Sequence, residues 1–111
     1  LEWFEDAYVL FTALRRVTPD VFYYKTKTGR EVDFITGRQS PSRMLVQVCE
    51  SMADRHTRKR ETTALAEAMT EFKLTHGTIV TRNEEEEIPV DSGTIDVVPA
   101  WRFLLNVAES A

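Results

Sequence analysis

Two carboxylates and one carboxamide are spaced along residues 23–50 so that they could meet on a small β-sheet. Side chains alternate between the two faces of a strand, so Glu31 and Asp33 are expected on one face. By the same rule, Gln47 and Cys49 share a face of a later strand. Oxygen ligands suit Mg²⁺, and a bound metal can activate water and neutralise charge on a phosphate. The layout suits a metal-dependent phosphodiesterase, except that Cys49 occupies the position where a lysine would be wanted.

The strands that would position these side chains follow from hydrophobic alternation and turn residues. We expect them at residues 21–27, 30–37 and 44–50. On the second strand, Val32 and Phe34 should face away from the two acids, and on the third Val46 and Val48 should face away from the amide and the thiol. The nearly continuous apolar character of the third strand predicts a central position in the sheet.

The rest of the chain reads as helices and short strands. We expect helices at 2–17, 54–74 and 100–109, and strands at 78–81, 88–90 and 94–98. Asp54 or Thr57 could cap the second helix, residues 76–77 should end it, and Pro99 should begin the last helix. The resulting order, α-β-β-β-α-β-(β)-β-α, predicts an α/β domain with a small mixed β-sheet flanked by helices.

Bulk properties narrow the class of protein. A chain of 111 residues, 42% hydrophobic and 29% charged, fits one domain at 1–111. Its lone cysteine fits a reducing cytoplasm, and no apolar run is long enough to span a membrane. Residues 1–60 hold 11 Lys/Arg against 8 Asp/Glu, while residues 61–111 hold 3 against 10. This balance argues against a general nucleic-acid coat, although it leaves room for a local basic surface in the first half.

An ordered set of short stretches carries a resemblance to known proteins. These stretches are residues 3–6, 23–34, 46–49, 58–65, 79–81 and 98–105. Together they resemble the PD-(D/E)xK, or restriction-endonuclease-like, nuclease fold. The whole chain resembles the C-terminal domain attached to bacterial and archaeal AAA+ ATPases of a large uncharacterised family. The start within a helical pattern, without an initiator Met, fits an excised C-terminal part of such an ATPase.

The resemblance assigns roles to individual residues. It implies that Glu5 is the first-helix acid, that Asp33 is the metal-binding acid, and that Gln47 is an amide variant of the second acid. Glu5 and Asp33 would then hold Mg²⁺ if the domain cleaves nucleic acid. Cys49 replaces the lysine of the fold, and losing such a charge-stabilising donor typically costs about 10²–10³ in rate. Basic residues that could contact nucleic acid are Lys25, Lys27, Arg58 and Lys59. Of these, Lys25, Lys27 or Arg58 could take over from the lysine.

These roles lead to a first function and two alternatives. The first is an accessory domain of an AAA+ ATPase, degenerate as a nuclease, that recognises a partner or substrate. It needs no cofactor of its own, because the chain has no Gly-x-x-x-x-Gly-Lys-Ser/Thr loop and ATP would bind only upstream. The alternatives are a Mg²⁺-dependent nuclease acting on DNA or RNA, and a structural domain that shapes the ATPase oligomer. Candidate partners are the upstream ATPase domain, nucleic acid and a second copy of the chain.

Plainer interpretations exist for the same residues. Glu31 and Asp33 could form cross-strand ion pairs with Lys25 and Arg30, worth about 0.2–1 kcal/mol each. Gln47 could be a structural amide, since a buried amide needs hydrogen-bond partners. Residues 84–87, four consecutive glutamates, are expected to form a solvated turn.

Overall fold

The computed structural model describes residues 2–17, 20–37 and 43–110, with side chains described for 8–16, 20–37 and 43–109. Nine elements follow one another in the described chain: α1 (Glu2–Val17), β1 (Val21–Lys25), β2 (Glu31–Thr36), β3 (Leu45–Val48), α2 (Arg55–Phe72), β4 (His76–Thr81), β5 (Glu86–Val90), β6 (Gly93–Pro99) and α3 (Ala100–Ser110). The strands form one six-stranded sheet in the order β1-β2-β3-β4-β6-β5. The predicted α/β class, with a mixed sheet flanked by helices, is confirmed.

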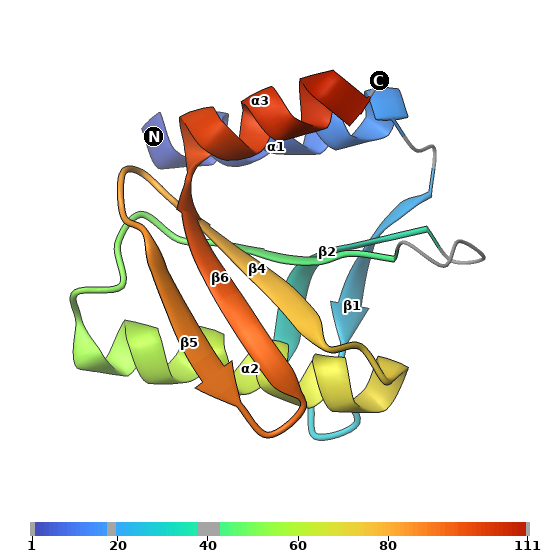
Figure 1. Ribbon diagram of the computed structural model, residues 1–111, viewed down its shortest axis with the longest axis vertical. Helices are drawn as coiled ribbons and strands as arrows, with labels where there is room; N and C mark the ends of the chain where they lie inside the picture. The colour runs from blue at the N-terminus through green and yellow to red at the C-terminus, as the bar shows by residue number, and fades with distance from the viewer. Residues whose placement is uncertain (1, 18–19, 38–42, 111) are drawn as a thin grey trace.

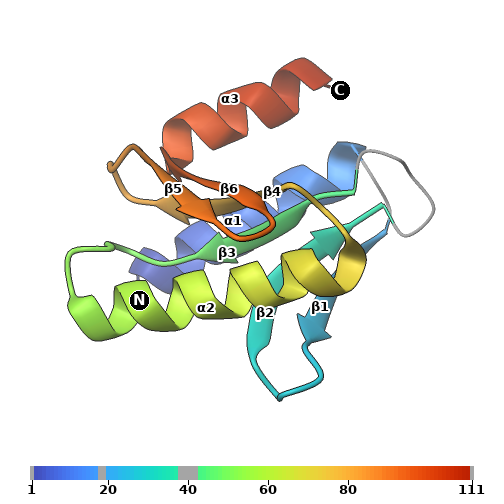
Figure 2. The ribbon, with the colours of Figure 1, turned by 60° about the horizontal axis from the view of Figure 1, so that its bottom comes forward.

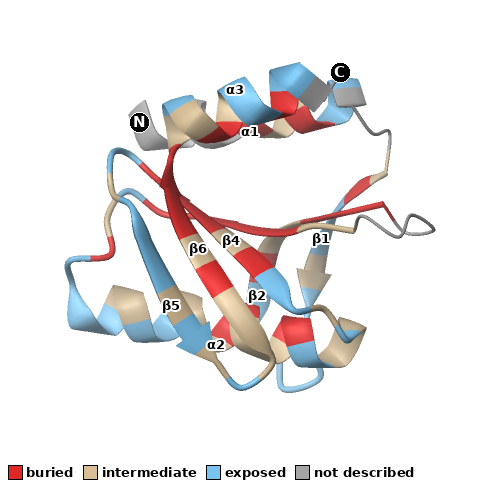
Figure 3. Cartoon of the chain, viewed as in Figure 1, coloured by how far each residue is buried: buried red, intermediate tan, exposed pale blue. Residues whose placement is uncertain are grey.

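The helices lie in two layers, with α2 on one face of the sheet and α1 and α3 on the other (Figures 1 and 2). Each face has its own apolar cluster. Leu65 and Met69 of α2 pack on one cluster, while Leu10 of α1 and Phe103 of α3 pack on the other. Figure 3 shows buried residues concentrated on the central strands, whereas the edge strand β5 is mostly exposed.

The topology explains which strand ends meet. β1, β2 and β3 form an antiparallel meander. Helix α2 then crosses over, and β3, β4 and β6 run parallel, so their carboxyl ends lie along one edge of the sheet. β5 pairs antiparallel with β6 at the outer edge of the sheet, where Pro89 is tolerated because an edge strand can lack one backbone donor. All four residues of β3 are buried, which confirms its predicted central position.

Several predicted boundaries were wrong. Residues 76–77 begin β4 instead of ending α2, because the helix already ends at Lys73, whose φ of 57° turns the chain out of the helix. Pro99 is the last residue of β6 and does not begin α3. Asp54 is the N-cap of α2, with its carboxylate accepting from the backbone N–H of Thr57 at 2.9 Å. The first two strands and β3 are also shorter than predicted.

The predicted alternation on β2 was wrong as well. Between Phe22↔Ile35 and Tyr24↔Val32, β2 uses one residue more than β1, so a bulge interrupts the pairing. A bulge shifts the alternation of side chains by one position. Val32 and Ile35 consequently pack in the cluster under α2, whereas Phe34 packs in the cluster under α1 and α3. Asp33 and Phe34 are the two residues of β2 within the bulge, opposite Tyr23 of β1.

Candidate functional site

The bulge on β2 places Asp33 where the β2–β3 ladder stops. The last ladder pairs described are Ile35↔Leu45 and Phe34↔Val46. Beyond these pairs, hydrogen bonds between side chains and the backbone join β2 to β3 in place of backbone–backbone hydrogen bonds. The carboxylate Oδ2 of Asp33 accepts from the backbone N–H of Val48 at 2.8 Å.

Gln47 completes this junction from the other strand. Its Oε1 accepts from the backbone N–H of Asp33 at 2.8 Å, and its Nε2 donates to the carbonyl oxygen of Glu31 at 3.1 Å. The same Nε2 donates to Oε2 of Glu61 at 2.9 Å. With only 1% of its surface exposed, Gln47 uses both ends of its amide inside the protein. We call Asp33, Gln47 and Glu61 the polar bracket, because they join β2, β3 and α2.

Glu61 is the member of the polar bracket that the sequence analysis missed. It lies on α2 four residues before Leu65, on the same stripe as the buried Ala68 and Met69. A single acid on an otherwise apolar stripe was the signal that could have identified it. Burial raises its pKa first, and the charge of Asp33 raises it further. Arg60 lies 3.6 Å away and opposes this shift.

Asp33 has the same electrostatic character. Burial raises the pKa of its carboxyl, the N–H of Val48 lowers it in part, and the charge of Glu31 raises it. Two acids with raised pKa values thus share one buried polar cluster. The structure brings Asp33 and Gln47 together as predicted, whereas Glu5 lies in α1 with its side chain outside the described residues.

Cys49 is part of the apolar cluster under α2 and is 6% exposed. Its Sγ lies 3.7 Å from the carbonyl oxygen of Ser51 and 3.6 Å from Sδ of Met52. Burial raises the pKa of the thiol to about 12, and the nearby charges of Glu61 and Glu84 act in the same direction. The group is therefore a neutral thiol at physiological pH and cannot replace the positive charge of a lysine.

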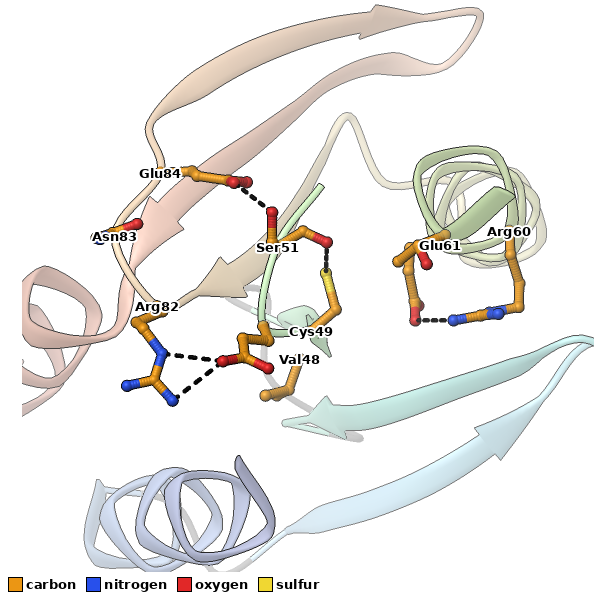
Figure 4. Close-up of a pocket in the computed structure, with 10 residues that line it drawn as sticks. Val48, Cys49, Ser51, Arg60, Glu61, Arg82, Asn83 and Glu84 are labelled. Atoms are coloured by element: carbon orange, nitrogen blue, oxygen red, sulfur yellow. Dashed lines mark hydrogen bonds and ion pairs between the residues drawn. The ribbon is translucent and has the colours of Figure 1, made fainter. Parts of the chain in front are cut away.

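Beside the polar bracket, an open hollow of about 550 Å³ lies at the carboxyl ends of β3 and β4 (Figure 4). Residues from three segments line it: 48–51, 82–84, and Thr57, Arg60 and Glu61 of α2. Arg82 crosses part of it to Glu50 at 3.2 Å. Its wall is polar and carries charges of both signs.

The predicted solvated turn at residues 84–87 was correct only in part, because Glu85, Glu86 and Glu87 are exposed, whereas Glu84 is half-buried and Glu86 and Glu87 belong to β5. Glu84 accepts from Oγ of Ser51 at 2.6 Å and from the backbone N–H of Met52 at 2.7 Å, which ties the loop after β3 to the loop after β4. The next acids reach other elements. Glu85 pairs with Arg102, and Glu86 pairs with Arg58. Of these glutamates, Glu84 is the one that lines the hollow.

The structure does not bring the four predicted basic residues together. Lys25 is the last residue of β1, and Lys27 lies in the turn that follows. The backbone N–H of Lys27 donates to the carboxylate of Glu71 near the end of α2. Arg58 and Lys59 lie near the beginning of that helix, roughly 20 Å from Glu71 at 1.5 Å rise per residue. Arg58 also donates to Glu86 at 2.9 Å. A single basic surface made of all four residues is therefore not formed within this chain.

Within the polar bracket, the amide of Gln47 is engaged at both ends and is not free to bind a Mg²⁺ ion. Mg²⁺ needs oxygen atoms free to coordinate it, yet Oε1 of Gln47 is engaged by a backbone N–H and its Nε2 points at Glu61. Among the side chains that the structure describes, no group of three or more His, Cys, Asp and Glu residues could hold a metal ion. None of the described helices is long and apolar enough to cross a membrane.

Comparisons with known proteins place the chain in a sequence family without a stated activity. A family model described as a domain of unknown function (DUF4143) matches residues 6–103. No curated protein and no solved structure matches the chain.

Proposed function

The chain belongs to the DUF4143 family, and from this premise we propose that it is a recognition module with a restriction-endonuclease-like fold, attached to an AAA+ ATPase. In this proposal the domain no longer cleaves nucleic acid. It contacts a partner or substrate beside the motor, and its nuclease position has become part of the framework of the fold.

One observation carries the proposal. The residues that would form the nuclease site, Asp33 and Gln47, are engaged in hydrogen bonds that hold the fold together. Both ends of the Gln47 amide are hydrogen-bonded, the oxygen to β2 and the nitrogen to Glu61 of α2. The carboxylate of Asp33 accepts from a backbone N–H of β3. The position of the fold's lysine is a buried thiol whose pKa is raised to about 12. The order of the first elements, a helix, a three-stranded meander, a helix and a parallel strand, supports the nuclease-like ancestry.

We assign recognition to the hollow at the carboxyl ends of β3 and β4. Open α/β sheets commonly bind ligands outside the carboxyl ends of their strands. The hollow there has arginine and glutamate side chains on its wall, with Arg82 and Glu50 half-exposed at its rim. Such paired charges suit a polar protein surface, because a partner can exchange its own charges with them.

A cleavage assay separates this proposal from a Mg²⁺-dependent nuclease. The full-length protein is incubated with plasmid and with single-stranded DNA and RNA, in Mg²⁺ or Mn²⁺. We expect no cleavage. Cleavage that disappears in Asp33→Ala would replace the recognition module with the nuclease as the better explanation.

A matched pair of variants tests the hollow. Arg82 and Arg102 have similar exposed fractions, 44% and 40%, and each pairs with a glutamate, but only Arg82 lines the hollow. In the full-length ATPase, Arg82→Asp should change the rate of ATP hydrolysis, because it alters the recognition surface beside the motor. Arg102→Asp should leave that rate unchanged. Equal rates for both variants and the wild type would remove the hollow from the proposal.

A further inference from the structure

The outer side of β1 is an edge of the sheet with which no element of the described chain pairs (Figure 1). Two backbone hydrogen bonds show how this strand is oriented. The carbonyl oxygen of Asp20 accepts from the N–H of Gly37, just after β2, at 3.1 Å. The N–H of Thr26 donates to the carbonyl oxygen of Arg30, just before β2, at 2.8 Å. Both bonds run toward β2, and backbone groups alternate between the two sides of a strand, so the odd-numbered residues of β1 point their N–H and C=O groups outward. These residues are Val21, Tyr23 and Lys25.

The two edges of the sheet differ in how they can meet another strand. β5 carries Pro89, which has no backbone N–H, and the exposed Glu86 and Glu87, and such residues hinder the pairing of a further strand. β1 has no proline and no acid. It is rich in aromatic residues, with Phe22 38% and Tyr23 56% exposed. An edge of this kind is a template for an extended backbone, so the molecule that fits it is a β-strand.

The pairing geometry of β1 is compatible with a second β1. In an antiparallel pair, the outward groups of one strand meet the outward groups of the other. Two copies of β1 related by a twofold axis bring all their outward residues together only when Tyr23 faces its own copy. Val21 then faces Lys25 at both ends of the pair. The one charged side chain of β1 therefore meets an apolar one, and no like charges oppose each other.

The same register aligns the aromatic side chains. Phe22 faces Tyr24 of the other copy on either side of the axis, and the two Tyr23 side chains face each other on the opposite face of the sheet. Aromatic pairs across strands stabilise a sheet by about 0.2–1 kcal/mol each. A groove of about 240 Å³ between β1 and the end of α2, lined by Phe22, Tyr24 and Phe72 among others, leaves room for side chains of the second copy. A strand without aromatic residues at these positions would lose the aromatic pairs.

We propose that a second copy of this chain pairs with β1 through its own β1, antiparallel about a twofold axis at Tyr23, which joins the two sheets into one. The interface is isologous, because each copy contributes the same strand. The outward backbone groups, the aromatic residues and the position of the single charge all match their own copies. β1 contributes no residue to the hollow at the carboxyl ends of β3 and β4, so pairing at β1 is independent of recognition at the hollow.

The mass of the 111-residue chain in solution tests the pairing. Sedimentation equilibrium should give a mass that rises from the 12.8 kDa of one chain toward twice that value at a concentration of about 100 μM, where even weak pairs form. A mass that stays at 12.8 kDa over this range would overturn the proposal.

Substitutions of two exposed tyrosines locate the interface. Tyr23→Pro deletes an N–H that faces away from β2, so the ladder within the chain stays intact and the pair should weaken by about tenfold or more. Tyr23→Thr keeps that N–H and the strand preference, and should weaken the pair by a smaller factor because the aromatic contact is lost. Tyr8 on α1 supplies the control, since it is 67% exposed against 56% for Tyr23, and Tyr8→Thr should leave the dissociation constant unchanged. Circular dichroism checks that each variant is folded. Folded Tyr23 variants that pair as tightly as the wild type would overturn the proposal.

Disulfide cross-linking tests the register. Residues that face each other in an antiparallel pair have Cα atoms about 5.5 Å apart, which a disulfide can bridge. Tyr23→Cys should therefore form a covalent dimer under mild oxidation. Lys25→Cys should not, because the two copies of position 25 lie four residues apart, roughly 13 Å along the strands. Cys49 is only 6% exposed and does not compete. Equal cross-linking of the two variants, or none in Tyr23→Cys, would refute the pairing.

Discussion

The polar bracket makes a quantitative prediction about stability. Replacing Gln47 with Met keeps the length of the side chain and removes the amide. The substitution would leave three groups without their partner: the N–H of Asp33, the carbonyl oxygen of Glu31 and a carboxylate oxygen of Glu61. A buried polar group left unsatisfied costs about 1–3 kcal/mol.

The three losses are not all complete, because Glu31 is exposed and water can reach its carbonyl. We therefore expect Gln47→Met to lower the free energy of unfolding by about 3–5 kcal/mol, a large part of the roughly 5–15 kcal/mol of a typical domain. Urea unfolding followed by circular dichroism measures this. With a slope of about 1–3 kcal/mol per molar urea, the midpoint should fall by roughly 2 M.

Thr62 on the same helix supplies the control. Its hydroxyl oxygen is buried and has no hydrogen-bond partner among the described residues. Thr62→Val removes that hydroxyl and breaks no bond, so the free energy of unfolding should change by less than about 1 kcal/mol or rise. A Gln47→Met variant as stable as Thr62→Val would refute the structural role that we give to the amide.

Three other predictions concern ionisation, reactivity and backbone space. In the folded protein the pKa of Glu61 is raised above the ordinary 4.5 of a glutamate. The contribution of Glu61 to stability is therefore complete below pH 4.5 and is lost as the pH rises through the raised pKa. Glu61→Gln should flatten this part of the curve of unfolding free energy against pH. Cys49, with its pKa raised from 9.0 to about 12, should react with iodoacetamide about 10³-fold more slowly in the native protein than in urea, and equal rates would contradict its burial. A Cβ at Gly93 would overlap the carbonyl oxygen of Thr75, so Gly93→Ala should lower the free energy of unfolding in urea by about 2–4 kcal/mol. At Gly29 a Cβ would meet no atom within 4 Å. Gly29→Ala should therefore lower the free energy of unfolding by only about 1–2 kcal/mol, because of its positive φ.

The order of elements could be predicted from sequence because helix and strand periods are local properties. The apolar stripe of α2 indicated a helix and the side of it that is buried. The continuous apolar run of β3 indicated a strand that is buried on both faces. The bulge could not be predicted in this way, since it depends on how β2 registers against β1. Alternation therefore gave the wrong face for Phe34.

The candidate site was predicted only in part for the same reason. Asp33 and Gln47 were expected to meet because strands β2 and β3 are consecutive. Glu61 reaches them from a helix beyond the next loop, and no spacing within a strand could include it. Glu84 belonged to a run of like charges that composition alone assigns to solvent, yet it accepts two hydrogen bonds from the loop after β3.

The amide of Gln47 decides between a framework role and a metal site, and this gives a last prediction. An amide both donates and accepts, so it can serve the backbone of β2 and the carboxylate of Glu61 together. A carboxylate at this position would only accept when ionised, and it would face the acids of Asp33 and Glu61. Gln47→Glu should therefore destabilise the domain at neutral pH more than at low pH.

Mg²⁺ should reverse part of that loss in Gln47→Glu and leave the wild type unaffected, because only the variant gathers three carboxylates. Binding with a dissociation constant of about 1 mM would add about 1.4 kcal/mol at 10 mM Mg²⁺. Urea unfolding with and without Mg²⁺, and with Na⁺ at equal ionic strength as control, measures the difference. Stabilisation of the wild type by Mg²⁺ to the same extent would mean that Gln47 does not keep the metal out, and the nuclease would then displace the recognition module as the better interpretation.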